Sequence, residues 1–207
     1  MIRDATPEDA AACAAIYAPY VRETAVTFET EPPDAAELAA RIAAAQREHA
    51  WLVAERDGAL LGYAYAGSFR GRRAYSRTAE TSVYLAPLAT GQGVGRALYT
   101  ALLDRLRDLG YGTAVAGMIP PNPGSAALHR SVGFTQVGAF TRVGRKFGRW
   151  HGCDWWEMAL REARSAVGGM PVPVVERRSC CFIHALPGCH ECAGCPRLSS
   201  PASPLGD

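Results

Sequence analysis

Residues 80–103 read ETSVYLAPLATGQGVGRALYTALL, and this stretch decides the fold. Its first part predicts a strand that ends near Leu85, and its last part has the apolar spacing of an amphipathic helix. Between them lies a glycine-rich loop, residues 90–96, whose glycines let the backbone approach a ligand. The first amides of a helix lack partners within it, and with the helix dipole they favour an anion. A glycine-rich loop alone also fits an ordinary tight turn, but the strand–loop–helix context predicts a phosphate site.

The sequence on both sides alternates between predicted strands and helices. Strands are expected at residues 2–5, 51–55, 60–66, 78–85, 113–119, 134–143 and 154–160. Helices are expected from residue 7 to about 21, from 34 to about 47, from 94 to 109 and from 125 to 132. This order predicts an α/β domain over residues 1–163, with a mixed central sheet flanked by helices. Because the glycine-rich loop follows a strand meander and lacks a Gly-Lys-Ser/Thr ending, we expect neither a dinucleotide-binding fold nor a kinase-type phosphate loop.

The composition is that of a soluble globular protein. Of 207 residues, 48% are hydrophobic and 20% are charged. The net charge of +2 argues against a protein that coats nucleic acid. The chain starts with no signal-like apolar segment and has no apolar run of about 18 residues, so we expect no membrane span and a cytoplasmic location.

The texture changes after residue 163. Residues 164–179 are predicted to be a linker, residues 180–196 are rich in cysteine, and residues 197–207 are predicted to be a disordered tail. The thiols Cys180, Cys181, Cys192 and Cys195 have a spacing that suits zinc or an iron–sulfur cluster. Further potential ligands keep a zinc site open, namely Cys189, His184 and His190. The remaining alternative is a fusion remnant that binds nothing.

Several blocks make the phosphate-site interpretation specific. Residues 80–103, followed by NPGSAALHRSVGF at 122–134, resemble the acyl-CoA-binding core of the GNAT N-acetyltransferase superfamily. Three further blocks resemble its phosphinothricin/methionine-sulfoximine acetyltransferase branch: VTFETEP at 26–32, FRGRRAYSRTAETSVYL at 69–85 and KFGRWH at 146–151. The resemblance covers about residues 1–162. It implies the GNAT fold, acetyl-CoA as cosubstrate, acetyl transfer to the amino group of a small amino acid or analogue, and a homodimer.

The resemblance also implies where acetyl-CoA binds. The expected contacts come from the end of a strand, the glycine-rich loop and a helix cap: Val83, Tyr84, Leu85, Gly91, Gln92, Gly93, Val94, Gly95, Arg96 and Asn122. Thr90 departs from the Gln or Arg usual in GNAT loops. Since these contacts are mostly made by the backbone in the family, we expect weaker binding of CoA rather than its loss.

Two residues are candidates for the acid–base steps. Glu80, a carboxylate in the middle of a strand, is the candidate general base, acting directly or through a water. The alternative for Glu80 is a solvated, outward-facing side chain, because burying an unpaired carboxylate costs free energy. His129 stands where many GNAT enzymes carry a Tyr thought to protonate the leaving thiolate. An imidazole has suitable chemistry, but a packed helix histidine is the alternative.

The acceptor is expected to meet an arginine-rich loop just before Glu80. Its cations are Arg70, Arg72, Arg73 and Arg77. Guanidinium groups pair with carboxylates and phosphinates, which a small amino acid or its analogue presents. The resemblance favours Arg72 and Tyr75 as contacts, with Phe28 and Thr30 lining the pocket, while a solvated loop remains the reading for Arg70 and Arg77.

The tail carries a second resemblance. Residues 177–198, RRSCCFIHALPGCHECAGCPRL, resemble the C-terminal [2Fe-2S] segment of siderophore-iron reductases, including the CC-x10-C-x2-C order. Nothing upstream resembles the rest of that family. A competing function is therefore an iron–sulfur redox or metal-sensing protein whose GNAT-like domain binds CoA for regulation.

Overall fold

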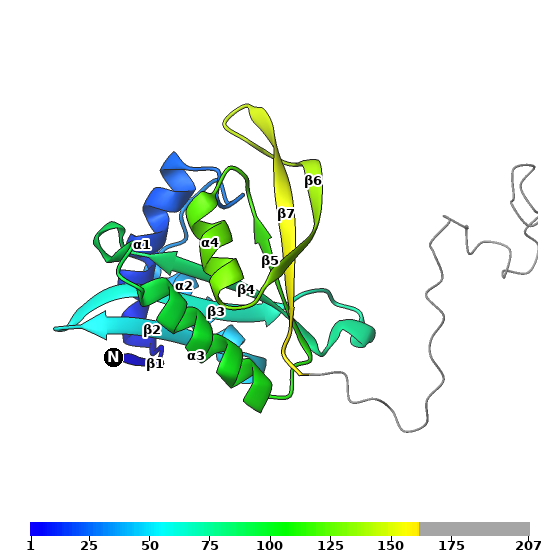
Figure 1. Cartoon of the computed structure of the whole chain (residues 1–207). Helices are drawn as coiled ribbons and strands as arrows, with labels where there is room; N and C mark the ends of the chain where they lie inside the picture. The colour runs from blue at the N-terminus through cyan, green and yellow to red at the C-terminus, as the bar shows by residue number, and fades with distance from the viewer. Residues whose placement is uncertain (162–207) are drawn as a thin grey trace, which may run out of the picture. The chain divides into compact units, whose positions relative to one another are not determined.

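The computed structural model describes residues 1–161, so the predictions for the linker and the cysteine-rich tail lie outside the described residues. Its centre is one seven-stranded sheet in the order β1-β2-β3-β4-β5-β7-β6. The strands are β1 Ile2–Asp4, β2 Trp51–Arg56, β3 Ala59–Ser68, β4 Thr78–Leu85, β5 Thr113–Met118, β6 Thr135–Lys146 and β7 Arg149–Ala159. Neighbouring strands pair antiparallel except β4 and β5, which are parallel. The predicted mixed sheet is confirmed (Figure 1).

Helices cover both faces of the sheet. They are α1 Ala10–Glu23, α2 Ala35–Glu48, α3 Val94–Asp108 and α4 Pro123–Ser131. One core lies under α3 and α4, and the other lies under α1 and α2. Successive side chains of β2 alternate between these cores, since Leu52 belongs to the first and Trp51 and Val53 to the second. Burial on both faces explains the nearly continuous apolar run of this strand. None of the described helices is long and apolar enough to cross a membrane.

The parallel pair separates partway along its length. The ladder joins Thr78, Ala79 and Glu80 to residues 113–115 of β5, although β4 continues to Leu85 and β5 to Met118. Beyond Glu80, β4 therefore keeps its partner β3 on one side and leaves its other edge without a β5 ladder in the described chain. This opening positions the site described below.

The last two strands are longer than the sequence predicted. The expected ranges 134–143 and 154–160 become a hairpin in which β6 reaches Lys146 and β7 begins at Arg149. Phe147 and Gly148 form its turn with φ angles of 50° and 74°. Two residues of positive φ fit the twist of a tight hairpin, but Phe is not a usual residue at the first of these positions, so Phe147-Gly148 does not match a known turn pattern.

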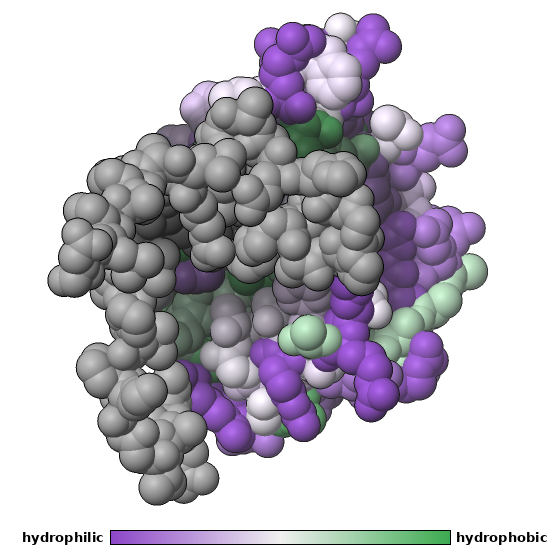
Figure 2. All heavy atoms as spheres, turned by 90° about the vertical axis from the view of Figure 1, so that its right-hand side faces the viewer, coloured by the Kyte–Doolittle hydropathy of each residue, from purple (hydrophilic) through white to green (hydrophobic). Residues whose placement is uncertain are grey.

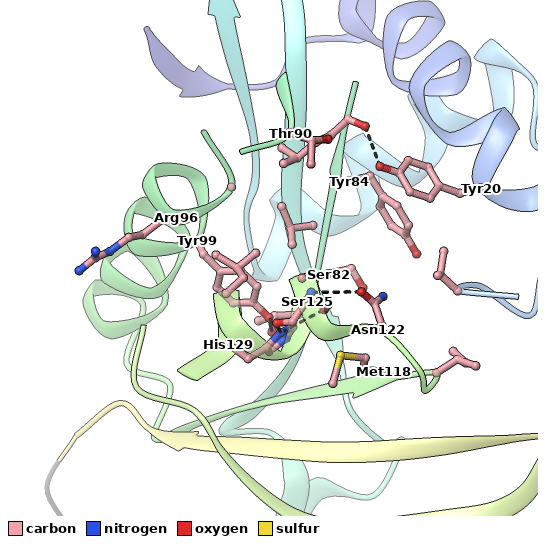
Figure 3. Close-up of a pocket in the computed structure, with 18 of the residues that line it drawn as sticks. Tyr20, Ser82, Tyr84, Thr90, Arg96, Tyr99, Met118, Asn122, Ser125 and His129 are labelled. Atoms are coloured by element: carbon pink, nitrogen blue, oxygen red, sulfur yellow. Dashed lines mark hydrogen bonds between the residues drawn. The ribbon is translucent and has the colours of Figure 1, made fainter. Parts of the chain in front are cut away.

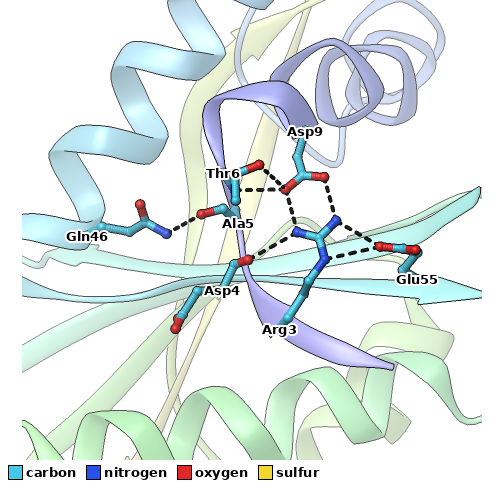
Figure 4. Close-up of polar contacts among 7 residues, drawn as sticks. All are labelled: Arg3, Asp4, Ala5, Thr6, Asp9, Gln46 and Glu55. Carbon is cyan, nitrogen blue, oxygen red and sulfur yellow. Dashed lines mark hydrogen bonds and ion pairs between the residues drawn. The ribbon is translucent and has the colours of Figure 1, made fainter. Parts of the chain in front are cut away.

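A charged cluster ties the N-terminal strand to the first helix. Asp9 accepts two hydrogen bonds from the guanidinium of Arg3, at 2.7 and 2.8 Å, and one from the backbone N–H of Thr6 at 2.8 Å. Arg3 also donates to Glu55 in β2 at 2.8 Å (Figure 4). These bonds hold the pKa of Asp9 at about 2, with the Arg3 bonds as the main cause. The cluster joins three elements at one edge of the sheet.

Candidate functional site

A cavity of about 490 Å³ lies where β4 and β5 separate. The strands contribute Thr81–Leu85 and Gly117–Met118 to its wall. Helix α3 with its N-cap, helix α4 with its N-cap and the end of α1 supply further lining residues, among them Gly93, Gly95, Arg96, Tyr99, Asn122, Ser125, His129 and Tyr20 (Figure 3). The Tyr20 hydroxyl donates to the Leu85 carbonyl at 2.7 Å, which connects α1 to this wall. The sequence thus brings the strand end, the glycine-rich loop and the helix cap around one space.

The glycine-rich loop forms one end of the cavity. Gly91 and Gly93 have φ angles of 77° and 79°, a conformation that disfavours any residue with a Cβ. Gly93 is the N-cap of α3, and the first helical bond recorded there runs from the Ala97 N–H to the Gly93 carbonyl at 3.0 Å. The amides of the first turn are consequently available to an anion. Two expected contacts do not line the cavity, because Val94 is buried in the core and Gln92 points its side chain toward Leu88 and Arg56.

Asn122 begins α4 at the cavity wall. Its side-chain Oδ1 accepts a hydrogen bond from the Ser125 N–H at 3.1 Å, so the predicted helix cap is confirmed. The cap fixes the first turn of α4 next to β5. Asn122 also lines the cavity, so it can contact a ligand while it caps α4.

His129 lies in a buried hydrogen-bonded chain. Its Nδ1 is 2.7 Å from the Ser125 carbonyl, which requires Nδ1 to carry the proton, so Nε2 accepts from the Tyr99 hydroxyl at 3.1 Å. The Tyr99 hydroxyl is 2.7 Å from the Thr81 hydroxyl, which in turn reaches the Val115 carbonyl at 3.1 Å. Burial lowers the pKa of His129 and raises that of Tyr99, so both side chains are neutral near pH 7.

Tyr99 is not among the candidate site residues predicted from the sequence. Tyr99 lies among the buried apolar residues of α3, yet its hydroxyl meets His129 and the residue lines the cavity. A phenol among leucines on a helix beside a glycine-rich loop was the available signal, since a buried hydroxyl needs a partner.

Glu80 lies at the point where the two strands separate. It is opposite Gly67 in β3 and Val115 in β5, one residue before the part of β4 that lines the cavity. Alternation along the strand places its side chain on the sheet face of α1 and α2. The carboxyl is half-buried, and burial raises its pKa while the nearby Arg70 acts in the opposite direction. The outward, fully solvated alternative does not describe this side chain.

The four expected acceptor residues form two groups. Phe28, in the loop of residues 24–34 between α1 and α2, packs toward the His151 ring at 6.3 Å between ring centroids. Tyr75 meets Phe69 edge to face, and Phe69 meets Trp155 in the same way, both at 5.6 Å. The side chains of Thr30 and Arg72 are exposed.

Two other arginines of the basic loop have structural contacts. The guanidinium of Arg70 lies 5.0 Å from the centroid of the Phe69 ring. Arg77 approaches the Leu109 carbonyl at 3.5 Å, at the C-terminus of α3. Cations near helix C-termini are favourable, so Arg77 fits a structural role. Residues 1–161 contain no cluster of His, Cys, Asp or Glu that would suit a metal ion.

Comparison with known proteins gives two family matches. Residues 2–155 match the acetyltransferase (GNAT) domain, and residues 177–197 match the FhuF 2Fe-2S C-terminal domain. The second match falls on the tail outside the described residues.

Individual relatives match most of this chain. A phosphinothricin N-acetyltransferase from Alcaligenes faecalis is 46% identical over 151 residues, covering 72% of this chain and 77% of the relative. The L-methionine sulfoximine/L-methionine sulfone acetyltransferase of Salmonella typhimurium is 36% identical, with coverages of 78% and 95%. A solved phosphinothricin acetyltransferase from Sinorhizobium meliloti in complex with acetyl-CoA superposes with a TM-score of 0.76 at 35% identity, covering 84% of this chain and 95% of that one.

Proposed function

This chain belongs to the GNAT acetyltransferase family, and we propose that it transfers the acetyl group of acetyl-CoA to the amino group of a small amino acid or analogue of the phosphinothricin and methionine sulfoximine type. The observation that carries the proposal is the cavity between β4 and β5, which ends at the free amides of α3. The acceptor class comes from the names of relatives with 35–46% identity.

The cavity fits the cosubstrate in three ways. The edge of β4 at Val83–Leu85, which has no β5 ladder, offers backbone groups to the cosubstrate, and Asn122 adds a side-chain amide. Amides that can bind a pyrophosphate come from Gly91, Gly93, Gly95 and Arg96. Gly95 keeps this end narrow, since a Cβ there would lie 3.2 Å from Leu85 and 3.3 Å from Leu128.

The transfer needs a neutral amine and a proton for the leaving sulfur. The amine nitrogen forms a bond to the thioester carbonyl carbon, the carbon–sulfur bond breaks, and the amine loses a proton. We assign that proton to Glu80, directly or through a water, because its raised pKa makes the carboxylate a better base. The thiolate takes its proton from the Tyr99 hydroxyl, which turns from its bond with His129 Nε2 toward the sulfur, and the resulting tyrosinate regains a proton from solvent.

The acceptor is proposed to meet Phe28 and Thr30 on one side and Arg72 and Tyr75 on the other. An exposed guanidinium is free to pair with the carboxylate or phosphinate of an incoming amino acid. An Arg72→Ala variant would lose more activity on acidic acceptors than on amines without an acid group, and equal losses on both would remove this contact from the proposal.

A panel assay tests the function. Acetyl-CoA consumption is followed with phosphinothricin, methionine sulfoximine, methionine sulfone and the common amino acids as acceptors. Saturable turnover with at least one of them supports the proposal. Binding of acetyl-CoA without acetylation of any member would overturn it.

A second candidate function rests on the match of residues 177–197 to a 2Fe-2S domain. We infer that Cys180, Cys181, Cys192 and Cys195 hold a [2Fe-2S] cluster, with zinc as the alternative metal. Clustered thiols in the reducing cytoplasm bind metal more often than they form disulfides. We therefore propose the cytoplasm as the location of the protein. Visible absorbance with equal iron and sulfide in anaerobically purified protein supports the cluster, whereas colourless, iron-free protein contradicts it. Removal of residues 165–207 then shows whether catalysis depends on this segment.

A homodimer is also proposed. The β6–β7 hairpin exposes apolar side chains, namely Val137, Phe140, Val143, Phe147 and Trp150. Figure 2 shows hydrophobic and hydrophilic side chains together at the hairpin tip, at the top of the view. Protein–protein interfaces are enriched in aromatic side chains such as these, and in arginine. Light scattering of the purified protein tests the oligomeric state, and a monomer at micromolar concentration would contradict it.

A further inference from the structure

Lys146 is the only lysine of the chain, and its side chain is buried at the end of β6. The residue is 4% exposed, and its ammonium donates a hydrogen bond to the Thr27 carbonyl at 2.8 Å, across 119 positions of sequence. A buried ammonium is costly unless it is paired. Burial lowers the pKa of Lys146, and the negative charge of Glu29 acts in the opposite direction. The loop of residues 24–34 therefore supplies both the acceptor and the nearby charge for this cation.

The next residue of the loop fits against the same strand. The ring of Phe28 occupies the space where a side chain at position 144 would lie, since a Cβ on Gly144 would overlap the Cζ and Cε atoms of that ring. His151, across the hairpin from Gly144, packs toward the same ring. Its Nε2 is 3.1 Å from the Lys146 carbonyl, which fixes the imidazole beside the strand end. Two consecutive loop residues are thus held by residues 144–151 of the hairpin.

The helices hold this segment from the opposite side. The Thr27 hydroxyl is 2.6 Å from the Tyr17 hydroxyl in α1, and that hydroxyl donates to Glu29 at 3.1 Å. Arg41 in α2 pairs with Glu29 at 2.7 Å. Residues 27–29 therefore sit between α1, α2 and β6, while Val26, directly before them, lines the cavity. A shift of this segment would move both the cavity wall and Phe28.

We propose that Lys146 is a positioning residue that, together with the side-chain-free notch at Gly144, fixes the loop of residues 24–34 in the conformation that receives the amino acid acceptor. The proposal rests on the proposed function for the identity of the acceptor. It assigns Lys146 no contact with either substrate. Its effect reaches the acceptor through Thr27 and Phe28.

Kinetics of three variants and one matched control test the proposal with the best acceptor of the panel. Lys146→Met removes the donor and should raise the KM for the acceptor about tenfold, with the KM for acetyl-CoA within about twofold of wild type. Lys146→Arg keeps a donor and a charge and should restore part of the loss. Gly144→Ala should push the Phe28 ring out and give the Lys146→Met pattern. Gly138→Ala, on the same strand with open space around the added methyl, is the matched control and should behave like wild type.

A second readout works without turnover. Amide hydrogen exchange in Lys146→Met should be faster in residues 24–34 and unchanged in α3, which shows that the domain remains folded. If no panel member is acetylated, the proposed function fails and this exchange result still decides the role of Lys146. Equal acceptor KM values in wild type and Lys146→Met, or unchanged exchange in residues 24–34, would overturn the proposal.

Discussion

At the scale of single residues, burial affects the protonation of three side chains in or next to the cavity. It keeps Tyr99 and His129 neutral and raises the pKa of the Glu80 carboxyl. Tyr99 and His129 are buried in a chain whose hydrogen bonds account for both imidazole nitrogens. Glu80, on the opposite side of β4, is half-buried and has a raised pKa. In the proposed mechanism, one strand of the sheet therefore separates the proton donor, Tyr99, from the proton acceptor, Glu80. General acid–base chemistry benefits when two groups in one site have opposite tasks.

The first prediction concerns Glu80. A general base works only when deprotonated, so kcat/KM should fall as the pH drops through the pKa of Glu80, and this limb should lie above the range of an ordinary glutamate. Glu80→Gln should lose the limb and reduce kcat/KM by about 100-fold near pH 7. A pH series of initial rates on both proteins measures this. An identical profile in the variant would exclude Glu80 as the base.

The second prediction concerns Tyr99. Tyr99→Phe removes the hydroxyl that His129 and Thr81 share, so kcat should fall about 100-fold if this hydroxyl delivers the proton to the thiolate. The lost hydrogen bonds should also lower the free energy of unfolding by about 1 kcal/mol. Single-turnover rates and urea unfolding separate the effects. A wild-type kcat with lowered stability would assign Tyr99 a structural role only.

At the scale of elements, the parallel strands and the crossover between them create the site. β4, the glycine-rich loop and α3 follow one another directly, so the strand end and the helix start face the same space. This arrangement was readable from residues 80–103, because the strand pattern, the glycines and the helical period are all local. The separation of β4 from β5 could not be predicted from the sequence, since it depends on which strands become neighbours in the sheet.

A third prediction tests the loop itself. Gly93→Ala forces a methyl group into a positive-φ position at the N-cap of α3, so the KM for acetyl-CoA should rise about tenfold or more. Gly58→Ala is the matched control, because Gly58 has a similar φ of 76° in the β2–β3 turn away from the cavity. Both variants should lose about 1 kcal/mol of stability. Only the first should alter the KM, and equal KM values would contradict a role of the loop in binding.

The sequence predicted the elements well and the contacts between them only partly. The strands expected at residues 51–55 and 60–66 are joined by a turn at Asp57-Gly58, a residue pair typical of hairpins, and the Asn122 cap is confirmed, because each is a local signal with one geometry. The extension of β6 to Lys146 was missed, since Phe147 adopts a positive φ that no pattern indicates. The link from Lys146 to Thr27 joins residues far apart in sequence, and one chain without its structure does not reveal such pairs.

At the scale of the whole molecule, the domain that the structure describes, residues 1–161, consists of two halves that meet at the sheet centre. The first half holds β1 to β4 with α1 and α2, and the second holds α3, α4 and β5 to β7. The short β4–β5 ladder and the helix packing of α3 on β2, β3 and β4 join them. The free energy of unfolding of such a domain is a small difference between large opposing contributions. Removing a single buried charge therefore changes it measurably.

The fourth prediction concerns Asp9 and global stability. The pKa of Asp9 falls from 3.8 to about 2 on folding, which corresponds to about 2 kcal/mol that is present above pH 3.8 and is lost as the pH falls toward 2. Asp9→Asn should therefore unfold with about 2 kcal/mol less free energy at pH 7, and the difference should shrink at pH 3. Asp4→Asn, which breaks the exposed pair with Arg105, should cost less than about 1 kcal/mol. Urea titrations at both pH values measure this, and equal costs for the two variants would contradict the burial argument.

Because the cavity lies in the opening between β4 and β5, it is also located at the boundary between the two halves. A ligand that contacts β4 in the first half and α3, α4 and β5 in the second holds the two halves together. It binds only the assembled domain, so each tenfold excess of ligand over its dissociation constant adds about 1.4 kcal/mol to the resistance against unfolding. Acetyl-CoA concentration would then set how long the domain survives heat or proteolysis, so the protein would last longest when its cosubstrate is abundant.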